Sequence, residues 1–202
     1  MAVRAARTPV PTHAGIARRE QILSEAARLF GRRGYHATTM REIGDASGLL
    51  AGSLYAHFSS KEDILHQVVL HAAHQFLGGL EALRAERVDP PDRLRRAMRA
   101  HISVVAGNLD AAWVFHHEWK ALTGSRGAEI RRLRDRYEAL WDEIVRDLPG
   151  NADPRFARLL VLSAANWTYT WFRPSGPLSP DEVADRFTTL LLEGLNNKEG
   201  SA

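Results

Sequence analysis

Apolar residues recur at helical spacing along nearly the whole of this chain, and signals for β-strands are almost absent. Ile22, Ala26, Leu29 and Phe30 show the pattern, at positions i, i+4, i+7 and i+8. No Asn-Gly or Asp-Gly pair stands between alternating apolar residues, as a tight hairpin would require. We therefore expect an all-α protein.

Capping residues and helix breakers divide the chain into about nine helices. Thr39 and Glu42 have the spacing of a capping box, Gly34 follows the first apolar stripe, and Pro149-Gly150 follows a long one. The expected helices span about 16–33, 39–48, 50–58, 61–87, 89–107, 108–123, 128–148, 153–172 and 179–196.

The absence of cysteine from all 202 residues excludes disulfides, thiolate catalysis and Cys-ligated metals. The uncharged stretches, such as residues 159–172, are all shorter than the roughly 20 residues that span a bilayer. Arg4 and Arg7 interrupt the first apolar-rich stretch, where a signal peptide would be uniformly apolar. We expect a cytoplasmic protein that does not contact a membrane.

Positive charge is concentrated at the N-terminal end. Residues 1–61 hold nine Lys and Arg against four Asp and Glu, whereas residues 62–202 hold eighteen against twenty. A basic end joined to a near-neutral remainder is typical of a chain that binds a polyanion through that end, although a solvated basic face is the alternative.

Residues 38–58, TTMREIGDASGLLAGSLYAHF, have the spacing of a helix-turn-helix, with the turn at Gly48-Leu49. Ile43, Leu49, Leu54 and Phe58 are the expected inward positions, which would pack against the first helix. The outward residues of the second short helix would then be free to enter a major groove.

Residues of about 15–75 resemble the DNA-binding domain of TetR-family transcriptional regulators of the AcrR type. The resemblance rests on ILSEAARLFGRRGYHATTMREIGDASG and GSLYAHFSSKEDIL and on their spacing. It implies a homodimer whose two reading helices contact half-sites of a near-palindromic double-stranded operator, about one helical turn apart. It also implies that residues 76–202 form a helical domain that binds a small-molecule effector and dimerises.

Carried over position by position, the resemblance implies phosphate contacts or base contacts for ten residues. They are Thr38, Thr39, Arg41, Leu50, Ala51, Gly52, Ser53, Tyr55, His57 and Lys61. A packing role for Tyr55 and a bystander surface position for His57 are the alternatives.

The reading helix departs from the family in being poor in hydrogen-bond donors. Leu50 and Ala51 stand where the family commonly has hydroxyl and basic side chains, and they can contact only thymine methyl groups. We therefore expect partly indirect reading of the operator. Upstream arginines, among Arg4, Arg7, Arg18 and Arg19, are expected to reach phosphates or a narrow minor groove.

Aromatic side chains are concentrated on three successive helices of the C-terminal part. Pairs such as Tyr137 and Trp141 are i,i+4 neighbours and therefore share a helix face. The expected effector-binding residues are His101, Trp113, His117, Tyr137, Trp141, Asn166, Trp167, Thr170 and Arg173. A large-residue core or a dimer seam is the alternative reading of these aromatics.

A narrower resemblance links GLLAGSLYAHF and NWTYTWFRPSGPLSPDEVADRFTTLLLEGL to TetR-family repressors of fatty-acid and steroid catabolism. Those repressors, as a group, are released from DNA by acyl-CoA thioesters, which implies an apolar slot and basic residues for the CoA phosphates. The candidates are Arg131, Arg132, Arg134, Arg136 and Arg173, with a solvated basic face as the alternative. A regulator of efflux or detoxification that responds to an aromatic compound is the other reading of the effector.

Two apolar segments, RLLVLSAANWTYTWF and VADRFTTLLLEGL, carry small residues such as Ala164, Ala165 and Gly194 that permit close helix approach. They predict a four-helix seam between two subunits. Effector binding would then tilt the long fourth helix and change the separation of the two reading helices from about 34 Å.

An enzyme or a metal-binding protein is the alternative from another class. His66, His71 and His74 lie on one helix, but no carboxylate joins them at useful spacing to complete a site. No phosphate loop, nucleophile elbow or pair of carboxylates occurs either. We therefore expect no catalytic residue, no metal and no cofactor.

Overall fold

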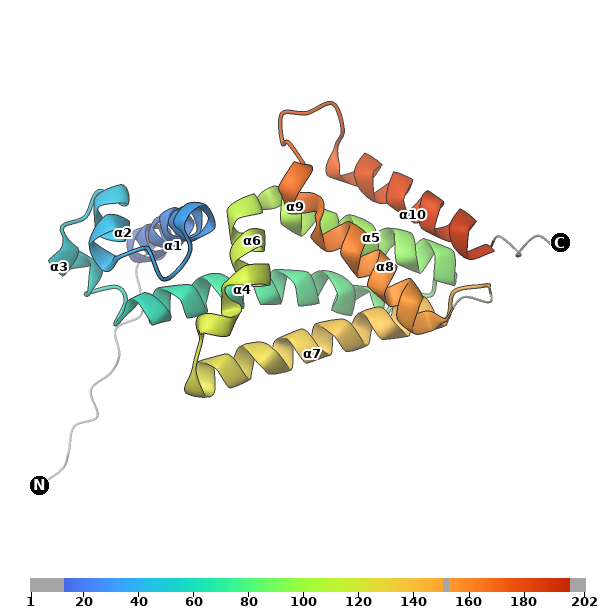
Figure 1. Ribbon diagram of the computed structural model, residues 1–202, viewed down its shortest axis with the longest axis horizontal. Coiled ribbons are helices and arrows are strands. Elements are labelled where there is room, and N and C mark those ends of the chain that lie inside the picture. The colour runs from blue at the N-terminus through green and yellow to red at the C-terminus, as the bar shows by residue number, and fades with distance from the viewer. Residues whose placement is uncertain (1–12, 151–152, 197–202) are drawn as a thin grey trace, which may run out of the picture.

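The computed structural model describes residues 13–150 and 153–196, and within these ranges every regular element is a helix (Figure 1). The elements are α1 (His13–Arg33), α2 (Met40–Ala46), α3 (Ala51–Leu54), α4 (Lys61–Leu83), α5 (Pro90–Gly107), α6 (Leu109–His117), the 3-10 turn η1 (Trp119–Ala121), α7 (Gly124–Arg146), α8 (Pro154–Asn166), α9 (Thr168–Trp171) and α10 (Pro180–Asn196). The expectation of an all-α protein is confirmed.

Helices α1, α2 and α3 form a small head at one end of the molecule, and α4 connects it to the rest (Figure 1). Of the four expected inward residues, Ile43, Leu54 and Phe58 are buried, together with Ile22 and Phe30 of α1, whereas Leu49 is half-buried. This packing is the one that the helix-turn-helix spacing predicts. A side chain shift in this small cluster would move the reading helix directly, because α3 has only four residues.

Side-chain caps explain why most helices begin where they do. The capping box of Thr39 and Glu42 is present in both directions, and Ser179 and Glu182 form a second one before Pro180. Asp89 accepts from the backbone N–H of Asp92, directly before two prolines. Local sequence therefore sets these starts.

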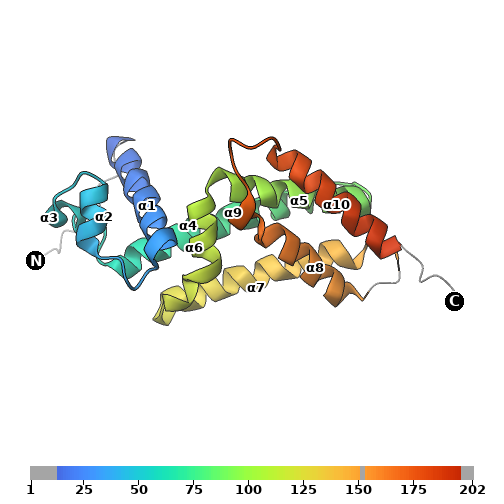
Figure 2. The ribbon, with the colours of Figure 1, turned by 45° about the horizontal axis from the view of Figure 1, so that its top comes forward.

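The larger C-terminal part surrounds α4 with the remaining helices. Helices α5, α6 and α7 pack against α4, α8 packs against α7, and α10 packs along α5 (Figure 2). The interior is filled by large side chains, among them Trp141, Phe115 and Met98, each almost fully buried. The core is therefore continuous from the head to the far end.

Several helix boundaries differ from the expected ones: α4 ends at Leu83 and not near residue 87, α6 ends at His117 and not near residue 123, and α7 begins at Gly124 and not near residue 128. The helix expected over 50–58 ends at Leu54, and the helix expected over 153–172 divides at Trp167 into α8 and α9. Gly127, which directly precedes the helix expected over 128–148, lies inside α7. A Cβ atom there would stand 2.5 Å from the carbonyl oxygen of Leu122, so only glycine permits this approach.

No helix in the ranges 13–150 and 153–196 combines the length and the apolar character that crossing a membrane requires.

Candidate functional site

The expected DNA-reading residues lie mostly on the outer face of the head. Leu50 is 82% exposed and Tyr55 is 57% exposed, which is unusual for large apolar or aromatic side chains. Thr39, Arg41, Gly52 and Ser53 are exposed as well, and His57 is half-buried. The side chain of Ala51 and the upstream Arg4 and Arg7 lie outside the described residues. DNA contacts for these positions remain a prediction.

Thr38 and Lys61 lie differently from the other expected phosphate contacts. The Thr38 side chain is buried, and its hydroxyl donates to the Gly34 carbonyl at 2.9 Å. The Lys61 ammonium donates to the carbonyls of Tyr35 at 2.8 Å and Thr38 at 2.6 Å. Desolvation lowers the pKa of Lys61. In this structure both groups stabilise the loop between α1 and α2, because its carbonyls have no helical partners.

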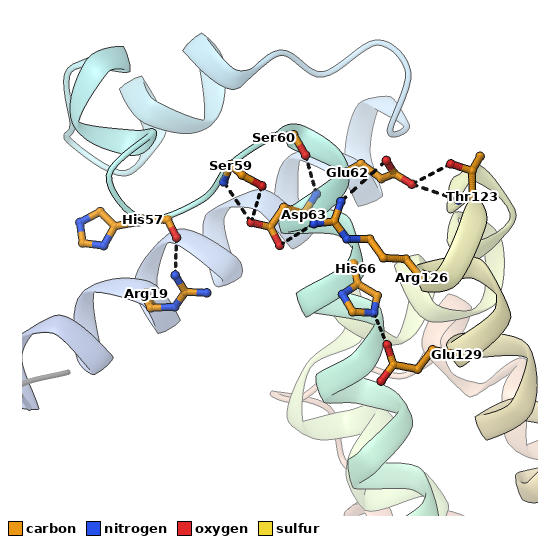
Figure 3. A network of polar contacts seen from close by, with 10 residues as sticks. All are labelled: Arg19, His57, Ser59, Ser60, Glu62, Asp63, His66, Thr123, Arg126 and Glu129. Carbon is orange, nitrogen blue, oxygen red and sulfur yellow. Dashed lines mark hydrogen bonds and ion pairs between the residues drawn. The ribbon is translucent and has the colours of Figure 1, made fainter. Parts of the chain in front are cut away.

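A polar junction joins the start of α4, just after the head, to the corner between η1 and α7 (Figure 3). The Arg126 guanidinium lies 3.3 Å from Asp63 and 3.8 Å from Glu62, two residues in the first turn of α4. Glu62 also accepts from the backbone N–H and the hydroxyl of Thr123, which lowers its pKa. The start of α4 is therefore bound to both halves of the molecule.

Two further contacts cross the same junction. His66 of α4 is buried and pairs with Glu129 of α7 at 2.8 Å (Figure 3). The carboxylate of Glu118, which follows α6, accepts the backbone N–H of Tyr35 at 3.0 Å. A displacement of the end of α6 would therefore move a group that touches the head directly, whereas a displacement of α7 would act on α4.

A solvent-open depression of about 550 Å³ lies between α6, α7, α8 and α9. Its walls combine apolar and polar groups, namely His116, His117, Glu138, Arg158, Leu159, Leu162, Ser163, Asn166, Trp167 and Tyr169. The His117 ring and the Tyr169 hydroxyl are joined by a hydrogen bond of 2.6 Å across it. A depression of this size is within the range of small-molecule sites.

Three of the nine expected effector residues, His117, Asn166 and Trp167, line this depression. Trp113 stands behind one of them, with its ring stacked on His117 at 4.6 Å between centroids. Thr170 and Arg173 are exposed but do not line the depression. Roles in ligand binding for these residues remain a prediction.

His101, Tyr137 and Trp141 occupy the core instead. All three are buried, and the Tyr137 hydroxyl and His101 Nδ1 are joined by a hydrogen bond of 2.7 Å. Burial lowers the pKa of His101 to about 3 and raises the pKa of Tyr137. The i,i+4 spacing of these aromatics therefore reflects packing, which the sequence leaves open as the alternative.

The wall of the depression includes two buried polar atoms with unused hydrogen-bonding capacity. The Nε2 atom of His116 and the Oδ1 atom of Asn166 are buried and have no hydrogen-bond partner among the described residues. Desolvation lowers the pKa of His116 to about 3, so its ring is neutral at physiological pH. A buried polar atom without a partner is costly, and a bound molecule that bonds to it recovers that cost.

Arg158 and Ser163 are lining residues that the sequence analysis did not identify. The Arg158 guanidinium lies 3.0 Å from Glu138 and 2.8 Å from Asp142. Positions 158, 159, 162, 163 and 166 follow the i, i+4 and i+8 spacing of one face of α8. That spacing was the available signal, although it does not by itself distinguish a cavity from the core.

The candidate arginines for CoA phosphates lie on α7 and after α9. Arg136 pairs with Glu81 at 2.5 Å, and Arg134 lies over the rings of Phe115 and Trp119. Arg131, Arg132 and Arg173 are exposed. None of the five lines the depression.

The three histidines considered as metal ligands are not brought together. His66 is buried against Glu129, whereas His71 and His74 are exposed. Within the described residues, no group of three or more His, Cys, Asp or Glu has the arrangement of a metal site.

Helices α8 and α10 lie side by side in the half of the molecule away from the head (Figures 1 and 2). Large apolar side chains that do not line the depression remain exposed on them, including Phe156, Leu160 and Leu190, the last 66% exposed. Exposed apolar surface of this extent marks an interaction surface. Its place agrees with the expected four-helix seam.

The neutral state of buried His101 makes stability depend on pH. In the unfolded chain the pKa of His101 is about 6.5, so the ring binds a proton as the pH falls below that value. In the folded chain the ring binds this proton only near pH 3. From pH 7 to pH 5, the free energy of unfolding should fall by about 2 kcal/mol more in the wild type than in His101→Phe.

Urea unfolding at the two pH values measures this difference. The His101→Phe variant also leaves the Tyr137 hydroxyl without its partner, so the pH dependence is compared and not the absolute stability. His74→Phe, which removes an exposed histidine, is the matched control. Equal pH dependence in the wild type and His101→Phe would contradict the prediction.

Comparison with known protein families matches both halves of the chain. Residues 22–68 match the family described as bacterial regulatory proteins, tetR family, and residues 87–195 match the tetracyclin repressor-like C-terminal domain. Neither match tests the predicted domain boundary at residue 75.

Curated relatives and solved structures agree with these matches. The repressor KstR2 of Rhodococcus jostii is 29% identical over 93% of this chain and 97% of its own length. The fatty acid metabolism regulator protein of Bacillus subtilis is 24% identical, over 88% of this chain and 95% of its own.

Among solved structures, the regulator PfmR of Thermus thermophilus is 36% identical with a TM-score of 0.77, covering 87% of this chain and 99% of its own. A structure of AibR in complex with isovaleryl coenzyme A and operator DNA is 30% identical, with a TM-score of 0.74 and coverage of 87% and 98%.

Proposed function

We propose that an acyl-CoA thioester of lipid or steroid catabolism releases this protein from its operator. The chain belongs to the TetR family of bacterial regulatory proteins and is therefore a DNA-binding transcriptional regulator. It acts as a dimer that represses transcription while bound to DNA. The thioester class is supported by the relative named as a fatty acid metabolism regulator and by the AibR complex with isovaleryl coenzyme A.

The observation that carries this proposal is the depression with its two unpartnered polar atoms. Leu159, Leu162 and Trp167 offer an apolar wall for an acyl chain or ring. His116 Nε2 and Asn166 Oδ1 offer hydrogen bonds to the polar groups of a thioester-linked ligand. Apolar walls with a few convergent polar groups are typical of ligand sites.

The depression and the DNA-reading head contact adjacent residues at the end of α6. His116 and His117 end α6, and the next residue, Glu118, holds the backbone of Tyr35 in the head. A ligand that displaces the end of α6 therefore changes the position of α4 and the head. The two reading helices then no longer match half-sites about 34 Å apart.

Fluorescence polarisation on a labelled fragment from the DNA upstream of its own gene tests the proposal, with and without a panel of acyl-CoA thioesters. We expect tight, salt-dependent binding that one thioester class releases. Binding that no thioester affects would refute the effector class and leave the regulator assignment unchanged. Release by aromatic compounds instead would favour a detoxification regulator.

A matched pair of variants tests the site itself. Ser163→Phe fills the depression, whereas Ser103→Phe adds the same ring to an exposed position of α5 outside it. We expect Ser163→Phe to raise the thioester concentration that releases half of the DNA by about tenfold or more. Ser103→Phe should leave that concentration unchanged, and both variants should bind the operator as tightly as the wild type. If the same thioester concentration released the operator from both variants, the effector site would lie elsewhere.

We also assign the protein to the cytoplasm, where its DNA target lies, and assign it no catalytic reaction. The family and its relatives are regulators, and binding alone accounts for their action.

A further inference from the structure

The reading helix α3 is too short to hold its own position. It has four residues, its N-cap Leu50 makes no side-chain cap, and Tyr55 to His57 continue only as a turn. Short helices are marginally stable in water and depend on tertiary contacts. The orientation of the reading segment, residues 51–58, must therefore come from groups outside it.

Arg19 of α1 makes such a contact at the far end of this segment. Its guanidinium donates to the carbonyl oxygen of His57 (Figure 3) and lies over the ring of Phe58, 4.2 Å from the centroid. The Phe58 side chain is buried, so its ring is a fixed platform. A guanidinium that both stacks on a ring and donates to a carbonyl fixes orientation as well as distance.

The neighbouring Arg18 carries the same charge without this contact. It donates to the side chain of Gln21 at 2.6 Å and reaches the carbonyl of Gly48 only at 3.4 Å. The two arginines therefore differ in structure while they are matched in charge and in position along α1.

We propose that Arg19 is a positioning residue for operator recognition, which sets the orientation of the reading segment and does not serve as a phosphate contact. This inference rests on the proposed DNA-binding function of the head. It replaces the sequence-based expectation that Arg19 reaches DNA, because the guanidinium is already engaged within the protein.

The test compares Arg19→Met with Arg18→Met, two variants that remove the same charge. Affinities for operator and for scrambled DNA are measured over a range of salt concentrations. Arg19→Met should lower operator affinity about tenfold, while its affinity for scrambled DNA stays within twofold of that of Arg18→Met. The slope of log affinity against log salt concentration should stay unchanged in Arg19→Met. A slope reduced by about 0.9 with equal losses on both DNAs would show a phosphate contact and overturn the proposal.

Hydrogen exchange without DNA gives an independent readout. The amides of residues 54–58 should exchange faster in Arg19→Met than in Arg18→Met, and equal exchange would overturn the proposal. This arm stands even if no operator is bound, so failure of the DNA-binding function is recognised separately. If Arg19→Met does not fold, Arg19→Lys keeps the charge and should still lose operator preference; wild-type preference in that variant would refute positioning by the guanidinium.

Discussion

Replacing Leu160 and Leu190 together with glutamate is expected to lower operator affinity by about 100-fold or more. Both side chains are exposed on α8 and α10, where an apolar surface has no cover within one subunit. Charges placed there would separate the subunits, and each head would then bind its half-site without the high effective concentration that the dimer supplies. Sedimentation and fluorescence polarisation on the same samples measure both effects.

The control for this experiment must carry the same change in charge, because two added carboxylates weaken DNA binding on their own. Ala85→Glu with Ala139→Glu adds them at exposed positions outside the apolar surface. The control should remain a dimer and lose far less affinity. A Leu160→Glu, Leu190→Glu protein that sediments as a dimer would place the seam on other helices.

Trp141→Ala is expected to lower the free energy of unfolding by about 4 kcal/mol, since it empties the largest fully buried side chain of the core. The ring packs against those of His101 and Tyr137, with centroids 6.1 Å and 6.2 Å away. These neighbours belong to different helices and cannot close the space without moving the backbone. Urea unfolding at one fixed protein concentration measures the loss.

Trp167→Ala is the matched control, because the Trp167 side chain is 61% exposed. Its removal should lower the free energy of unfolding by only about 1 kcal/mol. The pair also separates packing from ligand binding. The exposed residue lines the depression, so its loss should weaken the effector response with little change in stability. A loss below about 2 kcal/mol in Trp141→Ala would contradict the core assignment.

The helices could be predicted from the sequence largely because their starts are encoded locally. Thr39 with Glu42, Ser179 with Glu182 and Asp89 before two prolines each satisfy backbone groups within four residues. Other boundaries were less predictable. The helix expected over 50–58 ends at Leu54, and Gly127, which precedes the helix expected over 128–148, lies inside α7.

The outer face of the head was also predictable in part, because inward positions follow the period of short helices. Leu54 and Phe58 are buried while Leu50 and Tyr55 are exposed, as that period requires. Lys61 was not predictable, since its three carbonyl partners come from a loop more than twenty residues earlier in the chain.

The depression was the least predictable feature. Periodicity shows that Tyr137 and Trp141 share a helix face, but the neighbouring helices decide whether that face meets the core or a cavity. Arg158 enters the wall because α8 packs across α7, where Glu138 and Asp142 attract it. Such arrangements exist only once the helices have assembled.

The polar junction around the start of α4 has a consequence for anyone who would build a hybrid sensor from this protein. A foreign reading head grafted before residue 61 would have to place a backbone N–H where that of Tyr35 lies, because the Glu118 carboxylate accepts from that group. A foreign sensor domain would leave Asp63 without Arg126. The two halves are therefore not interchangeable parts, and a working exchange has to carry residues 118–129 along with the head.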